Sequence, residues 1–175
     1  ADFVLTRLLE LASYGADGFY FDESHMPKQG CWCESCRHRF TEETGLEHPQ
    51  QFDPTDQRWH QLVDFTNRSI ESTFLRWRQE LRAKYPDLVL VVGSHMWPAM
   101  TDRHMTSRLF RAVDSMKTEF SLALRTPLNP IFPLPHEMKP WEPDVKIALG
   151  YTLSRDACDG RPAHVWVPPM FHANA

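Results

Sequence analysis

Long apolar runs and a basic charge excess are both missing from this sequence of 175 residues. No apolar run approaches the roughly 18 residues that a membrane span needs, so we expect no transmembrane segment. The 19 lysines and arginines are outnumbered by 23 aspartates and glutamates, which gives a formal net charge of -4. Nucleic acid is therefore a poor candidate for the partner, because domains that bind it carry clustered positive charge.

The beginning of the chain lacks the features of a secretory signal. The opening stretch ADFVLTRLLELASYG is amphipathic and does not show a charged region, an apolar region and a cleavage site in that order. The chain also has no initiator Met, and its end, VWVPPMFHANA, stops just after a strand-like run. We therefore expect an internal piece of a longer protein.

Cysteine is scarce, and three of the four cysteines crowd into the segment CWCESC, at Cys31, Cys33 and Cys36. A disulfide framework would scatter its cysteines, so this cluster favours a reduced chain that binds a metal. We accordingly expect a cytoplasmic location, with export left open because the chain lacks its native start. Three thiolates in a C-x-C-x-x-C turn that leads into a helix can surround one tetrahedral zinc ion, with one position still to be filled.

The fourth zinc ligand stays open at this point. Cys158 fits by count, but the expected topology puts it on the opposite face of the sheet. His25 and His38 are nearer in sequence, and a residue from a preceding part of the protein is a further candidate. A zinc closed by four ligands would be structural, whereas an open one could activate water. Three free thiols without metal are the alternative.

Helical and strand-like patterns alternate along the chain. Apolar residues at helical spacing predict helices at residues 3–14, 33–44, 56–85, 103–112 and 144–155. Short apolar runs predict strands at residues 18–21, 88–93, 115–120 and 163–168. Asp53 or Thr55 is the expected N-cap of the longest helix, and the uniformly apolar run LVLVVG is typical of a parallel strand covered on both faces. This alternation predicts βαβ units and a parallel sheet.

Two architectures accommodate these β/α units, a section of a (β/α)₈ barrel and an open doubly wound sheet. Only seven glycines are present, and no glycine-rich phosphate loop follows any predicted strand. We therefore predict an α/β fold in which residues 1–175 form one domain, an incomplete and C-terminal section of a TIM barrel with about four β/α units. Because a full barrel needs about 250 residues, the section would have to pair with a missing barrel half or form a homo-oligomer.

Both architectures place ligands at the carboxyl ends of the parallel strands. The candidate residues that end or follow the four predicted strands are Asp22, Glu23, His25, His95, Trp97, Glu119 and Trp166. Asp22 and Glu119 close strands that are second neighbours in the predicted sheet. Their carboxyl groups could therefore face each other at the separation used in glycoside hydrolysis, about 5 Å for retention and about 6.5–9.5 Å for inversion. The alternative is a loop cap at Asp22 and an ion pair at Glu119.

Strand alternation allows only one of Asp22 and Glu23 to point into a barrel, and Asp22 shares its side with Tyr20. The histidines at this rim could hydrogen-bond a sugar hydroxyl. The two tryptophans could stack on the apolar face of a sugar, although most tryptophans are core residues.

The segments DGFYFDE and CWCESCRHRF resemble TIM-barrel glycoside hydrolases related to the alpha-L-fucosidases. In that group a strand written D-G-(apolar)-D is followed by C-x-C-x-x-C-(R)-x-x-F, and a similar cysteine cluster binds zinc in one family of TIM-barrel beta-galactosidases. The resemblance is strongest over residues 15–45 and continues, mainly in element order, to Pro168. It implies that Asp22 matches the fucosidase nucleophile, whereas Glu119 as acid/base rests on rim topology alone. The extra zinc-binding cysteine that precedes this strand in the galactosidases is absent here.

The expectation from the sequence is thus a retaining glycoside hydrolase of carbohydrate metabolism, with a carbohydrate substrate, a two-carboxylate mechanism and a structural zinc. One alternative is a non-catalytic carbohydrate-binding or interaction domain on a degenerate barrel. Another is a zinc-dependent hydrolase in which the metal is the reagent.

Overall fold

The computed structural model describes residues 2–24, 30–51, 53, 55–95, 107–119, 152 and 155–166, with the backbone alone at 94–95, 118–119 and 165–166. Its helices and strands are, in chain order, α1 (Asp2–Ser13), β1 (Gly18–Phe21), α2 (Glu34–Thr44), α3 (Gln57–Lys84), β2 (Val89–His95), α5 (Ser107–Ala112), β3 (Ser115–Glu119) and β4 (Ala163–Trp166). All four predicted strands are present. The helix expected at 144–155 lies almost entirely outside the described residues. No helix in the described part of the chain is both long and apolar enough to cross a membrane.

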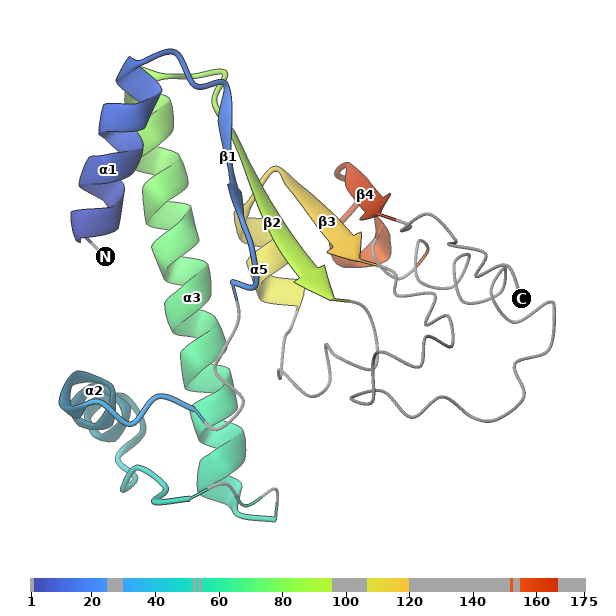
Figure 1. Ribbon diagram of the computed structural model, residues 1–175. Helices are drawn as coiled ribbons and strands as arrows, with labels where there is room; N and C mark the ends of the chain where they lie inside the picture. The colour runs from blue at the N-terminus through green and yellow to red at the C-terminus, as the bar shows by residue number, and fades with distance from the viewer. Residues whose placement is uncertain are drawn as a thin grey trace, which may run out of the picture.

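The four strands form one parallel sheet in the order β1-β2-β3-β4 (Figure 1). Each strand pairs with the next one along the chain, with Phe21 opposite Val92, Val92 opposite Met116 and Met116 opposite Ala163. This confirms the predicted α/β class and the parallel sheet. It also confirms that β1 and β3, which Asp22 and Glu119 close, are second neighbours.

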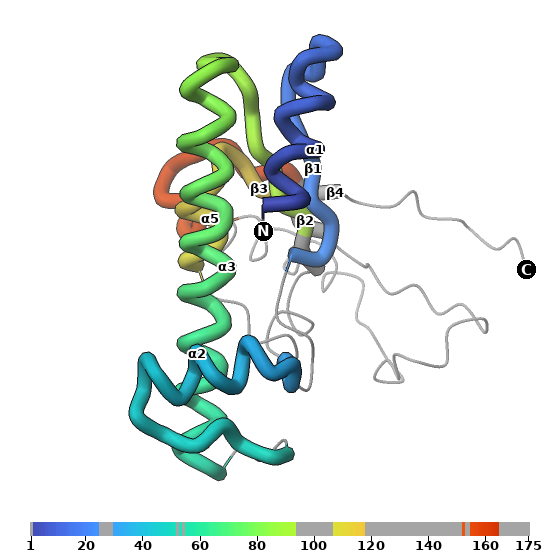
Figure 2. The backbone as a smooth tube through the Cα atoms, turned by 90° about the vertical axis from the view of Figure 1, so that its left-hand side faces the viewer, coloured from blue at the N-terminus to red at the C-terminus, as the bar shows by residue number. Residues whose placement is uncertain are grey.

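The helices α1, α3 and α5 pack against one face of this sheet, and Figure 2 shows α3 and α5 on the same side of the strands. The alternate strand residues Leu90, Val92 and Met116 are fully buried in this core. On β1, Phe21 stacks on Trp77 with ring centroids 5.5 Å apart and meets Phe74 edge-on at 5.0 Å. These contacts give β1 a helix-covered side that carries its phenylalanines.

The other face of the sheet is not covered by any helix of the described residues. Tyr20 is 46% exposed there and Val89 39%. Helix packing of the described residues covers LVLVVG on one face, where Leu88, Leu90 and Val92 are buried, and the expected cover of its second face stays a prediction. We call this second side, with Tyr20, Val89, Val91, Gly93 and Lys117, the open face.

The long helix α3 contributes residues to two hydrophobic clusters. Its C-terminal half covers the sheet through Phe74, Trp77 and Leu81, while its N-terminal half packs against α2 in a separate cluster of Phe40, Trp59, Leu62 and Phe65. Figure 1 accordingly shows α2 beside the end of α3 that extends past the sheet. The cysteine turn that precedes α2 is therefore held by the second cluster rather than by the sheet.

The N-cap of α3 is Asp56, whose carboxylate accepts a hydrogen bond from the main-chain N–H of Arg58 at 2.8 Å. The prediction of Asp53 or Thr55 was wrong. Asp53 instead accepts from the main-chain N–H and the hydroxyl of Thr55, at 2.8 and 2.7 Å, and so forms a turn just before the helix.

Asp114 ties α3 to the sheet. It lies just before β3, and its carboxylate accepts from the main-chain N–H of Leu90 at 2.9 Å, from Arg82 at 2.9 Å and from Arg78 at 2.6 Å. Since its side chain is only 13% exposed, this ion-pair network is shielded from solvent and fixes the position of β2 and β3 under the helix.

Candidate active site and metal centre

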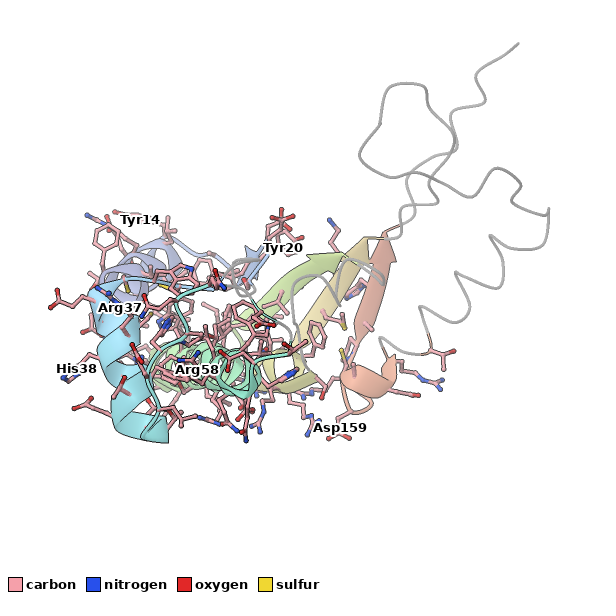
Figure 3. All side chains as sticks on the ribbon, turned by 90° about the horizontal axis from the view of Figure 1, so that it is seen from below. Tyr14, Tyr20, Arg37, His38, Arg58 and Asp159 are labelled. Atoms are coloured by element: carbon pink, nitrogen blue, oxygen red, sulfur yellow. The ribbon has the colours of Figure 1, made fainter. Side chains whose placement is uncertain are left out.

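Asp22 directly follows β1 and lies beside Tyr20 on the open face. The hydroxyl of Tyr20 donates a hydrogen bond to Oδ1 of Asp22 at 2.9 Å. Figure 3 shows Tyr20 on the side of β1 that faces away from α3 and α5. Burial, followed by the neighbouring Asp22 carboxylate, raises the pKa of Tyr20, with Lys117 acting in the opposite direction. Tyr20 therefore stays a neutral hydrogen-bond donor at neutral pH.

Gly93 leaves the space that this pair occupies. A Cβ at Gly93 would lie 2.0 Å from the Tyr20 hydroxyl oxygen and 2.9 Å from Oδ1 of Asp22, and real Cβ atoms essentially never make contacts below 3.0 Å. The tyrosine thus reaches from β1 across β2 at the position of β2 that has no side chain. On the far side, Nζ of Lys117 on β3 lies 5.2 Å from the centroid of the Tyr20 ring, a distance at which a cation and a ring attract each other.

Glu23 lies at the turn that follows Asp22. Its φ of 47 puts the backbone in the left-handed region, and its side chain is exposed. A non-glycine residue in this conformation marks a sharp change of chain direction. On the open face, Asp22 is the acid whose carboxylate accepts the hydrogen bond of Tyr20.

The backbone of His95, Glu119 and Trp166 forms one row across the carboxyl ends of β2, β3 and β4. His95 is the register partner of Glu119, and Glu119 is the partner of Trp166. Glu119 lies two strands from β1, which corresponds to about 10 Å between the two backbones. The side chains of these three residues, and His25 and Trp97 altogether, lie outside the described residues, so their predicted roles stay predictions.

No family model, curated protein or solved structure matches this chain.

The three cysteines form a compact group of free thiols. The sulfur atoms of Cys31, Cys33 and Cys36 all lie within 4.8 Å of one another, and those of Cys31 and Cys33 are 3.5 Å apart. The group exists because Cys33 is the N-cap of α2 and its sulfur accepts from the main-chain N–H of Cys36 at 3.4 Å. The first turn of α2 thereby places Cys36 close to Cys31 and Cys33.

The electrostatics of this group suit a cation. The main-chain N–H of Cys36 lowers the pKa of Cys33, whereas burial, aided by the two neighbouring sulfurs, raises the pKa of Cys36 to about 12. Without a positive charge, three adjacent thiols cannot all ionise, because each thiolate disfavours the next. A bound metal ion removes that conflict by deprotonating its thiol ligands. The donor set and spacing fit zinc, which takes tetrahedral sulfur and imidazole ligands.

The fourth ligands weighed from the sequence do not join this group in the described residues. His38 points outward from α2 (Figure 3) with Nδ1 3.2 Å from Oε2 of Glu42, and its side chain is 71% exposed. Cys158 is fully buried in the core between helices and sheet. His25 lies outside the described residues.

Sequence reasoning missed Gly93 and Lys117 as neighbours of the carboxylate. Gly93 carried a local signal, because a glycine inside a β-branched strand often marks the close approach of another group. Lys117 carried none, since its position beside Tyr20 depends on the register of three strands.

Proposed function

We propose that the chain is part of a TIM-barrel glycoside hydrolase in which Asp22 is the nucleophile. The observation that carries this proposal is the position of Asp22, at the carboxyl end of β1 on the open face, with its carboxylate oriented by Tyr20. In open α/β sheets and in barrels alike, this end of the strands is where ligands bind.

The sheet supports a barrel section over a doubly wound sheet. A doubly wound sheet reverses its strand order and carries helices on both faces. Here the strand order follows the chain, and the helices of the described residues that pack on the sheet, α1, α3 and α5, do so from one side. A face covered by helices and a second face lined by side chains are what every section of a (β/α)₈ barrel possesses.

In this mechanism the Asp22 carboxylate attacks the anomeric carbon while a second carboxyl group protonates the departing oxygen. Oδ1 accepts the hydrogen bond from Tyr20, and we assign the attack to Oδ2. Glu119 is the proposed acid/base, supported by its register position two strands away. His25, His95, Trp97 and Trp166 remain the proposed sugar contacts at this rim.

We further propose that the cysteine group holds a structural zinc ion. The group contains three thiols and, among the described residues, no carboxylate or histidine that could move a proton. It precedes α2, which packs through Phe40 against α3 rather than against the sheet. A zinc ion there would pin the segment between β1 and α2, and its free-thiol ligands would require the reducing environment of the cytoplasm.

The test is hydrolysis of a panel of aryl glycosides by the full-length gene product, with Asp22→Asn and Glu119→Gln beside the wild type. Asp17→Asn is the matched control, because Asp17 is an exposed acid just before the same strand. We expect Asp22→Asn to lower kcat by at least about 1,000-fold with an unchanged thermal midpoint, and Asp17→Asn to retain full activity. No turnover by folded, zinc-loaded wild type would refute the proposal and favour the carbohydrate-binding alternative.

A further inference from the structure

His48 is a buried histidine with one ring nitrogen unsatisfied. The residue is 2% exposed, and its Nδ1 lies 2.9 Å from the carbonyl oxygen of Pro49. Since a carbonyl can only accept, that geometry places the ring proton on Nδ1 and leaves a lone pair on Nε2. Nε2 has no hydrogen-bond partner, although it is buried. Such a lone pair can be satisfied by a hydrogen-bond donor or by a metal ion.

The ring of His48 packs against one residue of the cysteine turn and one residue of α2. Its centroid is 4.9 Å from that of Trp32, the residue between Cys31 and Cys33, and 5.3 Å from that of Phe40. Phe40 lies one helical turn after Cys36 on the same side of α2, because residues four apart share a face. The fold thus places the ring of His48 against Trp32, the residue between two of the thiols, although His48 lies twelve positions after Cys36 in the sequence.

We propose that Nε2 of His48 is the fourth ligand of a zinc ion held by Cys31, Cys33 and Cys36. Histidines that bind metals donate their other ring N–H to a backbone carbonyl or a carboxylate, and His48 already does so through Nδ1. Three sulfurs and one imidazole form a closed structural zinc site. The inference rests on the zinc site proposed above and does not depend on the glycosidase chemistry.

Zinc binding through His48 requires the segment after α2 to close on the thiols. The three sulfurs form their group without His48, whereas a zinc–nitrogen bond is about 2.0–2.1 Å long. The residues between α2 and His48 have few packing contacts to oppose this movement: Gly45 ends α2 in the left-handed conformation with no atom within 4 Å of a would-be Cβ, and Leu46 and Glu47 are exposed.

The experiment measures zinc affinity and coordination in the full chain. Zinc-edge X-ray absorption on the wild type should show three sulfur ligands and one imidazole nitrogen. Zinc affinity is then compared by chelator competition between wild type and His48→Phe, which keeps an aromatic ring against Trp32 and Phe40 but has no ring nitrogen. The matched control is His38→Ala, since His38 lies on α2 but is turned to solvent.

We expect His48→Phe to weaken zinc binding by more than about 100-fold, beyond the range typical of outer contacts, and to change the cobalt(II) absorption bands. His38→Ala should change neither. Three sulfurs with an oxygen or a fourth sulfur in the wild type would overturn the role of His48 and leave the zinc site standing. So would zinc affinity of His48→Phe within about threefold of the wild type. A wild type that binds no zinc would overturn both, while the glycoside assays test the catalytic proposal separately.

Discussion

The substitution Gly93→Ala adds a single methyl group on the open face and tests the arrangement around Asp22. The new Cβ would stand 2.0 Å from the hydroxyl oxygen and 2.7 Å from Cζ of Tyr20. Because real Cβ contacts essentially never fall below 3.0 Å, the hydroxyl must retreat by at least about 1 Å. The tyrosine is 46% exposed, so its ring can swing toward solvent instead of forcing β2 apart.

The cost in stability is small by this argument. Loss of an exposed hydrogen bond costs about 1 kcal/mol, and loss of the contact with Lys117 about 0.5–1 kcal/mol. Alanine in place of glycine recovers about 0.4–1 kcal/mol by restricting the unfolded chain, since Gly93 is not among the residues with positive φ. We expect a net destabilisation of no more than about 1–2 kcal/mol.

The cost in activity should be much larger. When Tyr20 retreats, Asp22 loses the hydrogen bond that orients it, and a misplacement of about 1 Å at a reacting group can lower a rate by about 100-fold, or about 2.7 kcal/mol. We therefore expect kcat/KM for an aryl glycoside to fall about 100-fold while the thermal midpoint changes little. Tyr20, moved toward solvent and released from Asp22, should also titrate at lower pH in ultraviolet absorbance, because burial and then the carboxylate raise its pKa.

A double-mutant cycle supplies the control. Once Tyr20→Ala has removed the ring, the added methyl group of Gly93→Ala should cost little further activity, because the main clash is gone. Val89→Ala, on the same face of the same strand but opposite Gly18 instead of Tyr20, should leave activity and the tyrosine titration unchanged. Wild-type activity in Gly93→Ala, or effects that simply add in the double variant, would show that Tyr20 does not orient Asp22.

Two further predictions concern stability. Asp114→Ala should lower the free energy of unfolding by about 2–4 kcal/mol in denaturant titrations, because it leaves a main-chain N–H and two arginines without their shared carboxylate. An effect as small as that of the exposed control Asp87→Ala would contradict this prediction. The side chain and main-chain N–H of Arg58 lower the pKa of Asp56, so its contribution should be present above the usual aspartate range and disappear as the pH falls through the lowered pKa. The difference in thermal midpoint between wild type and Asp56→Asn should therefore shrink on acidification, and a constant difference would show that the charge is not involved.

The strands and most helices could be predicted because their signals are local. GFYF, LVLVVG and the long amphipathic pattern that ends before Pro86 each carry their periodicity in the sequence. The start of α3 could not be fixed in the same way. The stretch DPTDQ contains several side chains able to cap a helix. Asp56 is the N-cap in the structure, because the carboxylate of Asp53 and the hydroxyl of Thr55 are hydrogen-bonded to each other.

The two sites depend on contacts that no local pattern contains. Tyr20 meets Lys117 because β1, β2 and β3 pair in one particular register, and a slip of one residue would place Val92 instead of Gly93 beneath the ring. His48 is buried because the chain folds back after Gly45 onto Trp32 and Phe40. The cysteines were visible in the sequence because one tight turn holds all three. The ligand proposed at His48 is instead indicated by a buried ring nitrogen without a hydrogen-bond partner. This feature can be seen only in the folded chain.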